Sequence, residues 1–185
     1  MRVDGIDPDA WGYPAGMATL DLHRLRLRSG ETRDLVLDAE LEPFVLGGQR
    51  YEASPAPVPL ALEVSQALGA TVFELRFDAR LSGPCMRCLG HAEVTVSVSA
   101  RELHDPEAPP ADELRSDYVA DDTLDVDAWA RDAIALALPD QILCRSECAG
   151  LCPVCGKDLN VAPHEHADRE LDPRWAALES LRESE

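Results

Sequence analysis

The sequence predicts an α+β protein built on an antiparallel, β-rich sheet, barrel-like or strongly curved, with a few packed helices and a cysteine-rich zinc knuckle region. Three observations predict this class. Apolar and polar residues alternate with a period of two in several segments, which is typical of strands with one buried face. Glycine and proline separate these segments, and four of the six cysteines gather near the C-terminal end, in residues 144–155.

The chain divides into three predicted parts. Residues 1–16 have the composition of a loop and precede a second methionine, Met17, so we expect a flexible N-terminal extension. Residues 17–140 are expected to form the β-rich core domain with a CxxC hairpin and a helix. Residues 141–185 are expected to hold the Cys-rich segment and a C-terminal helix that docks on the core.

The first candidate element is LHRLRLR, residues 22–28. Its alternation predicts a strand with the leucines facing inward and the arginines facing outward. Further strands are expected in RDLVLDAEL (33–41), VLGGQRYEA (45–53) and PLALEVSQAL (59–68).

The clearest predicted element is a hairpin. In TVFELRFDARL (71–81) and HAEVTVSVSARE (91–102), apolar residues alternate strictly with polar ones. The connection SGPCMRCLG is short, so we expect two antiparallel strands whose tip carries Cys85 and Cys88.

Two helices are expected after the hairpin. DVDAWARDAIALALP (125–139) has apolar residues at helical spacing, a cap at Asp125 or Asp127, and a proline that ends it. LDPRWAALESLRE (171–183) has an aspartate that can cap and a proline suited to the first turn.

Charge limits the possible partners. The chain carries 17 Lys and Arg against 35 Asp and Glu, a net charge of −18. Binding to a phosphate backbone depends on basic side chains that displace counterions, so a protein this acidic is repelled by bulk nucleic acid and favours basic partners. The N-terminus lacks the apolar stretch of a secretion signal, and we expect a cytoplasmic protein without a membrane segment.

The cysteines indicate a metal site. CMRCLG (85–90) and CPVCG (152–156) are CxxC pairs, here called the first and the second knuckle, each followed closely by a glycine that suits a tight turn. In a reducing cytoplasm such pairs favour metal ligands over disulfides. The predicted cofactor is one structural zinc ion per chain, held by four of the six cysteines. The candidate ligands are Cys85, Cys88, Cys144, Cys148, Cys152 and Cys155.

The sequence leaves open which four cysteines bind. One set is local and uses Cys144 and Cys148 with the second knuckle; another joins the two knuckles; a third joins Cys144 and Cys148 with the first knuckle. A two-zinc cluster with all six is a further possibility. We favour the set that joins the two knuckles, because the hairpin tip would otherwise have no use for its own CxxC.

Other chemistries fit the pattern less well. The spacing CxxxCxxC that ends at Cys155 occurs in iron-sulfur enzymes that use S-adenosylmethionine, but their large barrel needs more chain. A thioredoxin-like CxxC starts a helix, whereas CMRC lies in a hairpin turn. His164 and His166 could ligate metal, although a flexible solvated segment is the expectation there. We find no catalytic or cofactor-binding residues and no small-molecule substrate pattern, and predict that the protein is not an enzyme.

The motifs resemble a known family. CMRCLG after a strand, the helix with AIALALP, then CxxxCxGLCPVCGKDLN and DPRWAALESL, in this order, are similar to the YceD family of large ribosomal RNA accumulation proteins. The resemblance runs from about residue 33 to 182. It implies a bacterial cytoplasmic factor needed for accumulation of large-subunit (23S) ribosomal RNA, typically encoded beside a small basic ribosomal protein of that subunit. Some members of the family lack some of these cysteines, which implies that the metal is structural and takes no part in a reaction.

Three functions follow as hypotheses. The first is a ribosome-biogenesis factor that binds a basic large-subunit ribosomal protein or an assembly factor, and contacts ribosomal RNA indirectly. The second is a direct binder of ribosomal RNA through LHRLRLR, Arg76 and Arg80. The third, a metal or redox enzyme, would need an open metal position beside a substrate-sized cleft.

Overall fold

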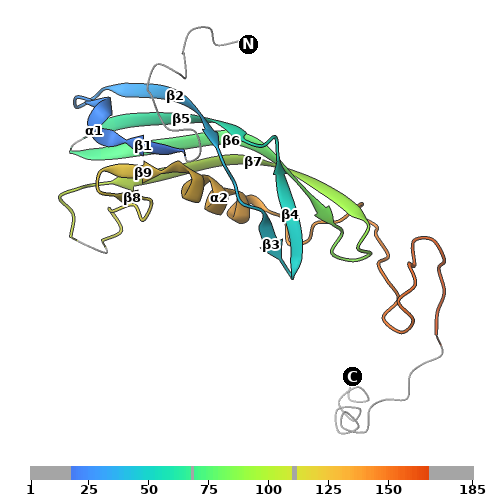
Figure 1. Cartoon of the computed structure of the whole chain (residues 1–185). Coiled ribbons are helices and arrows are strands. Elements are labelled where there is room, and N and C mark those ends of the chain that lie inside the picture. The colour runs from blue at the N-terminus through green and yellow to red at the C-terminus, as the bar shows by residue number, and fades with distance from the viewer. Residues whose placement is uncertain (1–17, 68, 110–111, 167–185) are drawn as a thin grey trace, which may run out of the picture.

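A computed structural model describes residues 18–67, 69–109 and 112–166 of the chain (Figure 1). The predicted N-terminal extension (1–16) and the predicted C-terminal helix (171–183) lie outside the described residues.

The main sheet is antiparallel throughout, as predicted. Its strands are β2 (Thr32–Ala39), β3 (Phe44–Leu46), β4 (Gln49–Ser54), β5 (Val58–Ala67), β6 (Ala70–Pro84) and β7 (His91–His104). The order is β2-β5-β6-β4-β3, with β7 paired to the other side of β6. Among the described strands, β2 and β7 each pair with a single neighbour, so the sheet is open and is not closed into a barrel.

The β6–β7 hairpin forms as expected. It pairs continuously from Thr71 opposite His104 to Pro84 opposite His91. The predicted apolar face of β6 is buried, with Phe73, Leu75 and Leu81 fully inaccessible to solvent. Figure 1 shows the two strands running side by side to a tip beyond the rest of the sheet, where both cysteines of the first knuckle lie.

The segment LHRLRLR does not form the predicted strand. A second sheet, with the order β1-β9-β8, is built from β1 (Thr19–Asp21), β8 (Val119–Ala120) and β9 (Thr123–Asp125). Directly after β1 the chain makes one helical turn, α1 (Leu22–Leu25), and Arg26 then takes a left-handed conformation with φ of 44°.

The leucines and arginines of this segment still have the expected burial, although the segment is not a strand. Leu25 is buried and Leu27 is half-buried, while Arg24, Arg26 and Arg28 are exposed. A period of two predicts a strand only if the chain runs straight, and here the chain turns back after pairing with β9.

Helix α2 (Val126–Ala137) packs its apolar side on the sheet. Asp125 is the cap, because its carboxylate accepts a hydrogen bond from the N–H of Ala128 at 2.9 Å. The other candidate cap, Asp127, accepts backbone N–H groups of Ala18 and Glu40 at 2.9 Å each and so fastens the helix to two neighbouring segments. Trp129 is buried with its ring edge-on to Phe73, centroids 6.4 Å apart.

The helices of the described part of the chain are too short or too polar to cross a membrane.

A close approach of β4 to β6 braces the hairpin just before its tip. Gly83 faces Tyr51, and a methyl group on Gly83 would overlap the Tyr51 ring and lie 2.8 Å from the carbonyl oxygen of Arg50. The Tyr51 hydroxyl donates a hydrogen bond to the carbonyl oxygen of Pro84 at 2.7 Å. The end of β6 is therefore fixed immediately before Cys85.

Candidate metal centre

The first knuckle is a tight turn closed by its own backbone. The N–H of Cys85 donates to the carbonyl oxygen of Gly90 at 2.6 Å, and the N–H of Leu89 donates back to the carbonyl oxygen of Cys85 at 2.9 Å. The left-handed position of the turn, with φ of 61°, belongs to Leu89 and not to the glycine that the sequence suggested. The turn directs the N–H of Arg87 at the Cys85 sulfur, 3.5 Å away.

The segment after α2 docks on this turn. Ile142 is 1% exposed, and its carbonyl oxygen accepts the N–H of Met86 at 2.9 Å. Arg87 adds three bonds: its carbonyl oxygen accepts the N–H of Leu151, and its guanidinium donates to the side chain of Gln141 and to the carbonyl oxygen of Cys148. These contacts carry Cys144 and Cys148 to the hairpin tip.

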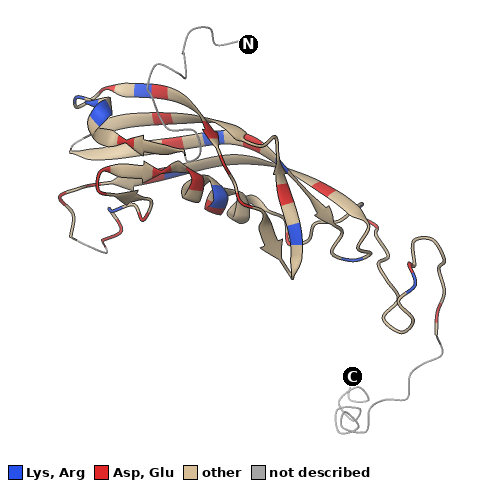
Figure 2. Ribbon diagram, in the orientation of Figure 1, with Lys and Arg blue, Asp and Glu red and all other residues tan. Residues whose placement is uncertain are grey.

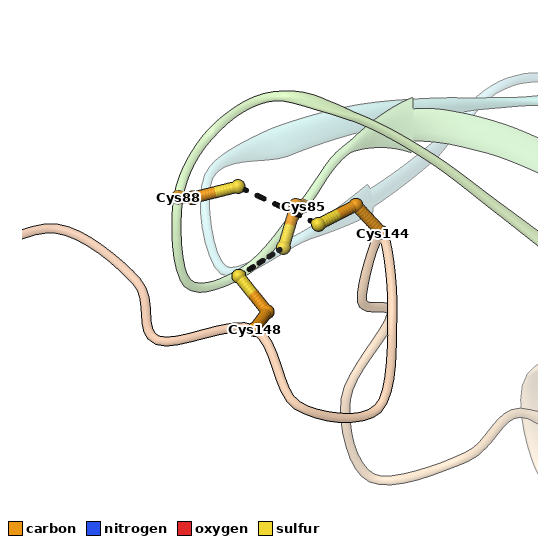
Figure 3. Close-up of side chains that lie close together, drawn as sticks. All are labelled: Cys85, Cys88, Cys144 and Cys148. Atoms are coloured by element: carbon orange, nitrogen blue, oxygen red, sulfur yellow. Dashed lines mark hydrogen bonds between the residues drawn. The ribbon is translucent and has the colours of Figure 1, made fainter. Parts of the chain in front are cut away.

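Four sulfur atoms converge there (Figure 3). The residues of this four-cysteine group are Cys85, Cys88, Cys144 and Cys148. The Sγ atoms of Cys85 and Cys148 are 3.8 Å apart, those of Cys88 and Cys144 are 3.7 Å apart, and all four lie within 4.8 Å of one another. A tetrahedral ion with metal–sulfur bonds of about 2.3 Å separates its sulfur ligands by about 3.8 Å. All four are free thiols, and the spacing fits a metal ion.

The protonation of these thiols is uneven. Burial works to raise the pKa of Cys85, but hydrogen bonds from the backbone of Cys88 and Arg87 outweigh it and lower that pKa to about 6. Partial desolvation, together with hydrogen bonds to Cys148 and Cys88, raises the pKa of Cys144 to about 12. Thiolates packed this closely repel one another, and a bound cation would remove that repulsion and keep all four deprotonated.

Asn160, which follows the second knuckle in the sequence, contacts the four-cysteine group by hydrogen bonds. Its amide nitrogen donates to the Sγ of Cys148 at 3.5 Å and to the carboxylate of Asp158 at 2.7 Å. Its amide oxygen accepts the N–H of Ala149 at 2.9 Å and a guanidinium N–H of Arg145 at 2.7 Å. A side chain that holds a ligand in this way orients it for the metal.

The second knuckle lies in a separate group. Its members are Cys152, Cys155, His164 and His166, whose potential ligand atoms also lie within 4.8 Å of one another. The predicted set that joins the two knuckles is therefore not the arrangement observed. Of the alternatives left open, the third is the one that the structure brings together.

One of the two histidines differs from expectation, whereas His166 is exposed. The sequence favoured a solvated segment, but His164 is half-buried and its Nε2 lies 3.1 Å from the Sγ of Cys155. The described chain thus offers two sets of four ligands, whereas the sequence predicted one zinc ion. That the six cysteines bind metal stays a prediction.

Sequence reasoning missed Arg87 and Asn160. Arg87 lies inside CMRC and Asn160 ends GLCPVCGKDLN, so both occur within the motifs that drew attention to the cysteines. Neither residue type is a typical metal ligand. Their contacts with the cysteines form only because the segment after α2 docks on the hairpin tip, which the spacing of residues does not reveal.

The chain is similar in sequence to known proteins. The sequence profile named "Large ribosomal RNA subunit accumulation protein YceD" matches residues 73–182, which include nearly all of the hairpin, α2 and all six cysteines. The chain is 32% identical over 176 residues to the uncharacterized protein Rv2926c of Mycobacterium tuberculosis, covering 92% of this chain and 84% of that protein. It is 35% identical over 116 residues to the uncharacterized protein YlbN of Bacillus subtilis, covering 58% of this chain and 66% of that protein.

No solved structure matches the chain significantly. The profile spans more than half of the chain, and the mycobacterial relative is matched over most of its length. The chain therefore belongs to the family of the large ribosomal RNA subunit accumulation protein YceD.

Proposed function

We propose that this protein is a cytoplasmic ribosome-biogenesis factor needed for accumulation of large-subunit (23S) ribosomal RNA, and that it acts by binding a basic ribosomal protein or assembly factor. The observation that carries the proposal is the family match over residues 73–182, the part of the chain that holds the hairpin and the cysteines.

In this proposal the four-cysteine group holds one structural zinc ion. Zinc accepts four thiolates in a tetrahedron, and four protein ligands leave no coordination position for a substrate. The ion would join the hairpin tip, at Cys85 and Cys88, to the segment after α2, at Cys144 and Cys148. Its contribution is to folding, in keeping with a protein that works by binding and not by catalysis.

Charge supports a basic partner. The net charge is −18, and such a field attracts basic proteins and repels RNA. Two acidic segments are candidates for the contact, DPEAPPADE (105–113) and VADDTLDVD (119–127). Within the second, Asp125 and Asp127 hold α2 in place by hydrogen bonds to backbone N–H groups.

Of the six other acidic residues in these segments, we take four as the candidates for the contact. They are Asp112, Glu113, Asp121 and Asp122. Asp121 and Asp122 form the turn between β8 and β9, with φ of 48° and 56°. Asp122 also faces a basic group of the chain itself, the imidazole of His23 at 2.9 Å.

The arrangement of basic residues favours this proposal over direct RNA binding. Figure 2 shows Lys and Arg scattered among Asp and Glu along the described ribbon. In the two candidate RNA-binding regions, Arg24 pairs with Asp21 and Arg76 pairs with Glu74. Arginines paired in this way have fewer donors and less charge to offer a phosphate.

Neutralising the acidic contact is expected to weaken the protein complex. In the quadruple variant D112N, E113Q, D121N and D122N, we expect binding to a basic large-subunit ribosomal protein to fall at least about tenfold at about 0.1 M salt, because the long-range attraction is lost. Asparagine retains the turn conformation at Asp121 and Asp122, since it tolerates positive φ. Calorimetry or fluorescence anisotropy with the purified proteins measures the change.

A matched control separates the acidic contact from total charge. The variant D34N, D38N, D78N and D140N removes the same charge from four exposed positions elsewhere. We expect it to bind nearly as well as the unmodified chain. Equal losses in the two variants would show that only net charge matters, and tight binding of naked large-subunit RNA by both would favour the direct RNA binder.

A further inference from the structure

We propose that Cys152, Cys155, His164 and His166 form a second metal site, separate from the four-cysteine group, that binds a zinc ion or a similar divalent cation through two sulfur and two nitrogen atoms. This inference is independent of the proposed function, since it concerns ligands that the four-cysteine group does not use.

The two knuckles share one backbone design. In the second knuckle the N–H of Cys152 donates to the carbonyl oxygen of Lys157 at 2.8 Å, and the N–H of Gly156 donates back to the carbonyl oxygen of Cys152 at 2.8 Å. The first knuckle has the same two bonds at the same offsets, between Cys85 and Gly90 and between Leu89 and Cys85. Both turns also place their fifth residue in the left-handed conformation, at φ of 61° for Leu89 and 71° for Gly156.

This shared pattern has a chemical purpose in each turn. It orients backbone N–H groups toward the first sulfur, which stabilises a thiolate. In the second knuckle, the backbone N–H groups of Cys155 and Val154 are directed at the sulfur of Cys152. A turn that directs backbone N–H groups at the first sulfur of a CxxC pair is prepared to ligate a cation.

The orientation of the His164 ring suits a metal ligand. Its Nδ1 lies 2.8 Å from the carbonyl oxygen of Ala162, so in the neutral ring the proton is on Nδ1, where it is donated to that oxygen. The lone pair is then on Nε2, which points at the sulfur of Cys155 from 3.1 Å. Metal-bound histidines typically donate their other ring N–H to a carbonyl or carboxylate in this way.

The fourth ligand completes the set. The rings of His164 and His166 meet edge to face with centroids 4.9 Å apart, and ligand atoms of both lie within 4.8 Å of both sulfurs. Two thiolates and two imidazoles are a donor set that suits tetrahedral zinc. Four side chains contribute to the set, two of cysteine and two of histidine, and none of them is a carboxylate.

The two sites differ in exposure. In the four-cysteine group two sulfurs are buried, whereas in the second site only Cys152 is buried and both Cys155 and His166 are exposed. We therefore expect the second ion to exchange faster with solvent and chelators than the first.

The second ion would stabilise the loop that contains Asn160, whose amide contacts the four-cysteine group. It closes a loop from Cys152 to His166, and that loop contains Asn160, which bonds the sulfur of Cys148. The bridge between Leu151 and Asp158 and the bond from the N–H of Leu159 to the carbonyl oxygen of Gly150 tie the same loop to the segment beside the hairpin tip.

Metal counting with variants tests the proposal. Full-length protein produced with zinc supplied, then freed of loosely bound metal by gel filtration, is expected to contain two zinc ions per chain by mass spectrometry. The double variant H164A and H166A is expected to contain one, because two ligands of the second site are gone. The control His23→Ala removes an exposed histidine on α1 and is expected to keep both ions.

Release kinetics and cobalt spectra assign the ions. With a chromophoric chelator, zinc should leave the unmodified chain in a fast and a slow phase, and the fast phase should be absent in H164A and H166A. Cobalt bound to Cys85→Ser should show the weaker thiolate charge-transfer absorption of a site with two sulfurs. One ion in the unmodified chain, or two retained in the double histidine variant, would overturn the second site. If the unmodified chain holds one ion and Cys85→Ser loses it, the four-cysteine site of the proposed function still stands. An unmodified chain without metal would contradict both sites.

Discussion

Replacing Cys85 with serine is expected to release the ion of the four-cysteine group and to destabilise the fold by several kcal/mol. Cys85 is fully buried, and its sulfur contacts that of Cys148. A serine oxygen is a poorer ligand that reaches less far, and metal binding that is coupled to folding adds directly to the stability of the folded chain. In a chain of this size each kcal/mol lost lowers the melting temperature by about 2–4 °C. Elemental analysis and thermal unfolding measure the two effects.

The matched variant is Cys155→Ser, which alters the second knuckle. Because Cys155 lies in the other group, we expect this variant to retain the ion of the four-cysteine group and most of its thermal stability. If Cys85→Ser and Cys155→Ser lost the same single ion, the site would instead join the two knuckles, as the sequence suggested.

The second large effect is expected at Gly83. An added methyl group in Gly83→Ala would collide with the Tyr51 ring and with the backbone of Arg50, both held in a paired strand. Overpacking of this kind costs typically 1–3 kcal/mol, and we expect about 3 kcal/mol here because one of the two contacts is with backbone atoms that move little. The shift in the denaturant midpoint measures it.

The neighbouring change Ser82→Ala is the control. Ser82 lies one position before Gly83 on the same strand and pairs with Glu52. Its replacement adds no atoms, so we expect it to change the free energy of unfolding by less than about 0.5 kcal/mol. Equal stability of Gly83→Ala and Ser82→Ala would show that β4 and β6 do not approach as closely as described.

Much of the fold is predictable where one regular period controls the burial. The hairpin β6–β7 and helix α2 each bury one face, so alternation and helical spacing locate them, and the side chain of Asp125 marks the start of α2. The order of strands in the sheet is harder to predict from the sequence, because β4 pairs with β6 across a stretch of chain that includes all of β5.

The small sheet of β1, β8 and β9 escaped prediction for a related reason. Its strands are two or three residues long, too short to show a period, and β1 pairs with β9 across about a hundred residues of chain. The same pairing turns the chain into α1, where a straight strand was expected.

The candidate metal ligands illustrate a different limit. The spacing of the CxxC pairs identifies Cys85, Cys88, Cys152 and Cys155 as candidates, but spacing alone does not decide which pairs meet. That choice follows from the docking of Ile142 and Arg87, which brings Cys144 and Cys148 to the hairpin tip. The orientation of His164 was not predictable from spacing, because it depends on a carbonyl oxygen, which every residue possesses.

The most direct test of a role in large-subunit biogenesis through protein contacts is affinity purification of the tagged full-length chain from its own cells, with and without RNase and at rising salt. We predict that a basic large-subunit protein or an assembly factor co-elutes at low salt, remains after RNase treatment, and is lost as the salt screens the acidic surface. Co-elution of large-subunit components that disappears after RNase, or no large-subunit component under any condition, would contradict this account.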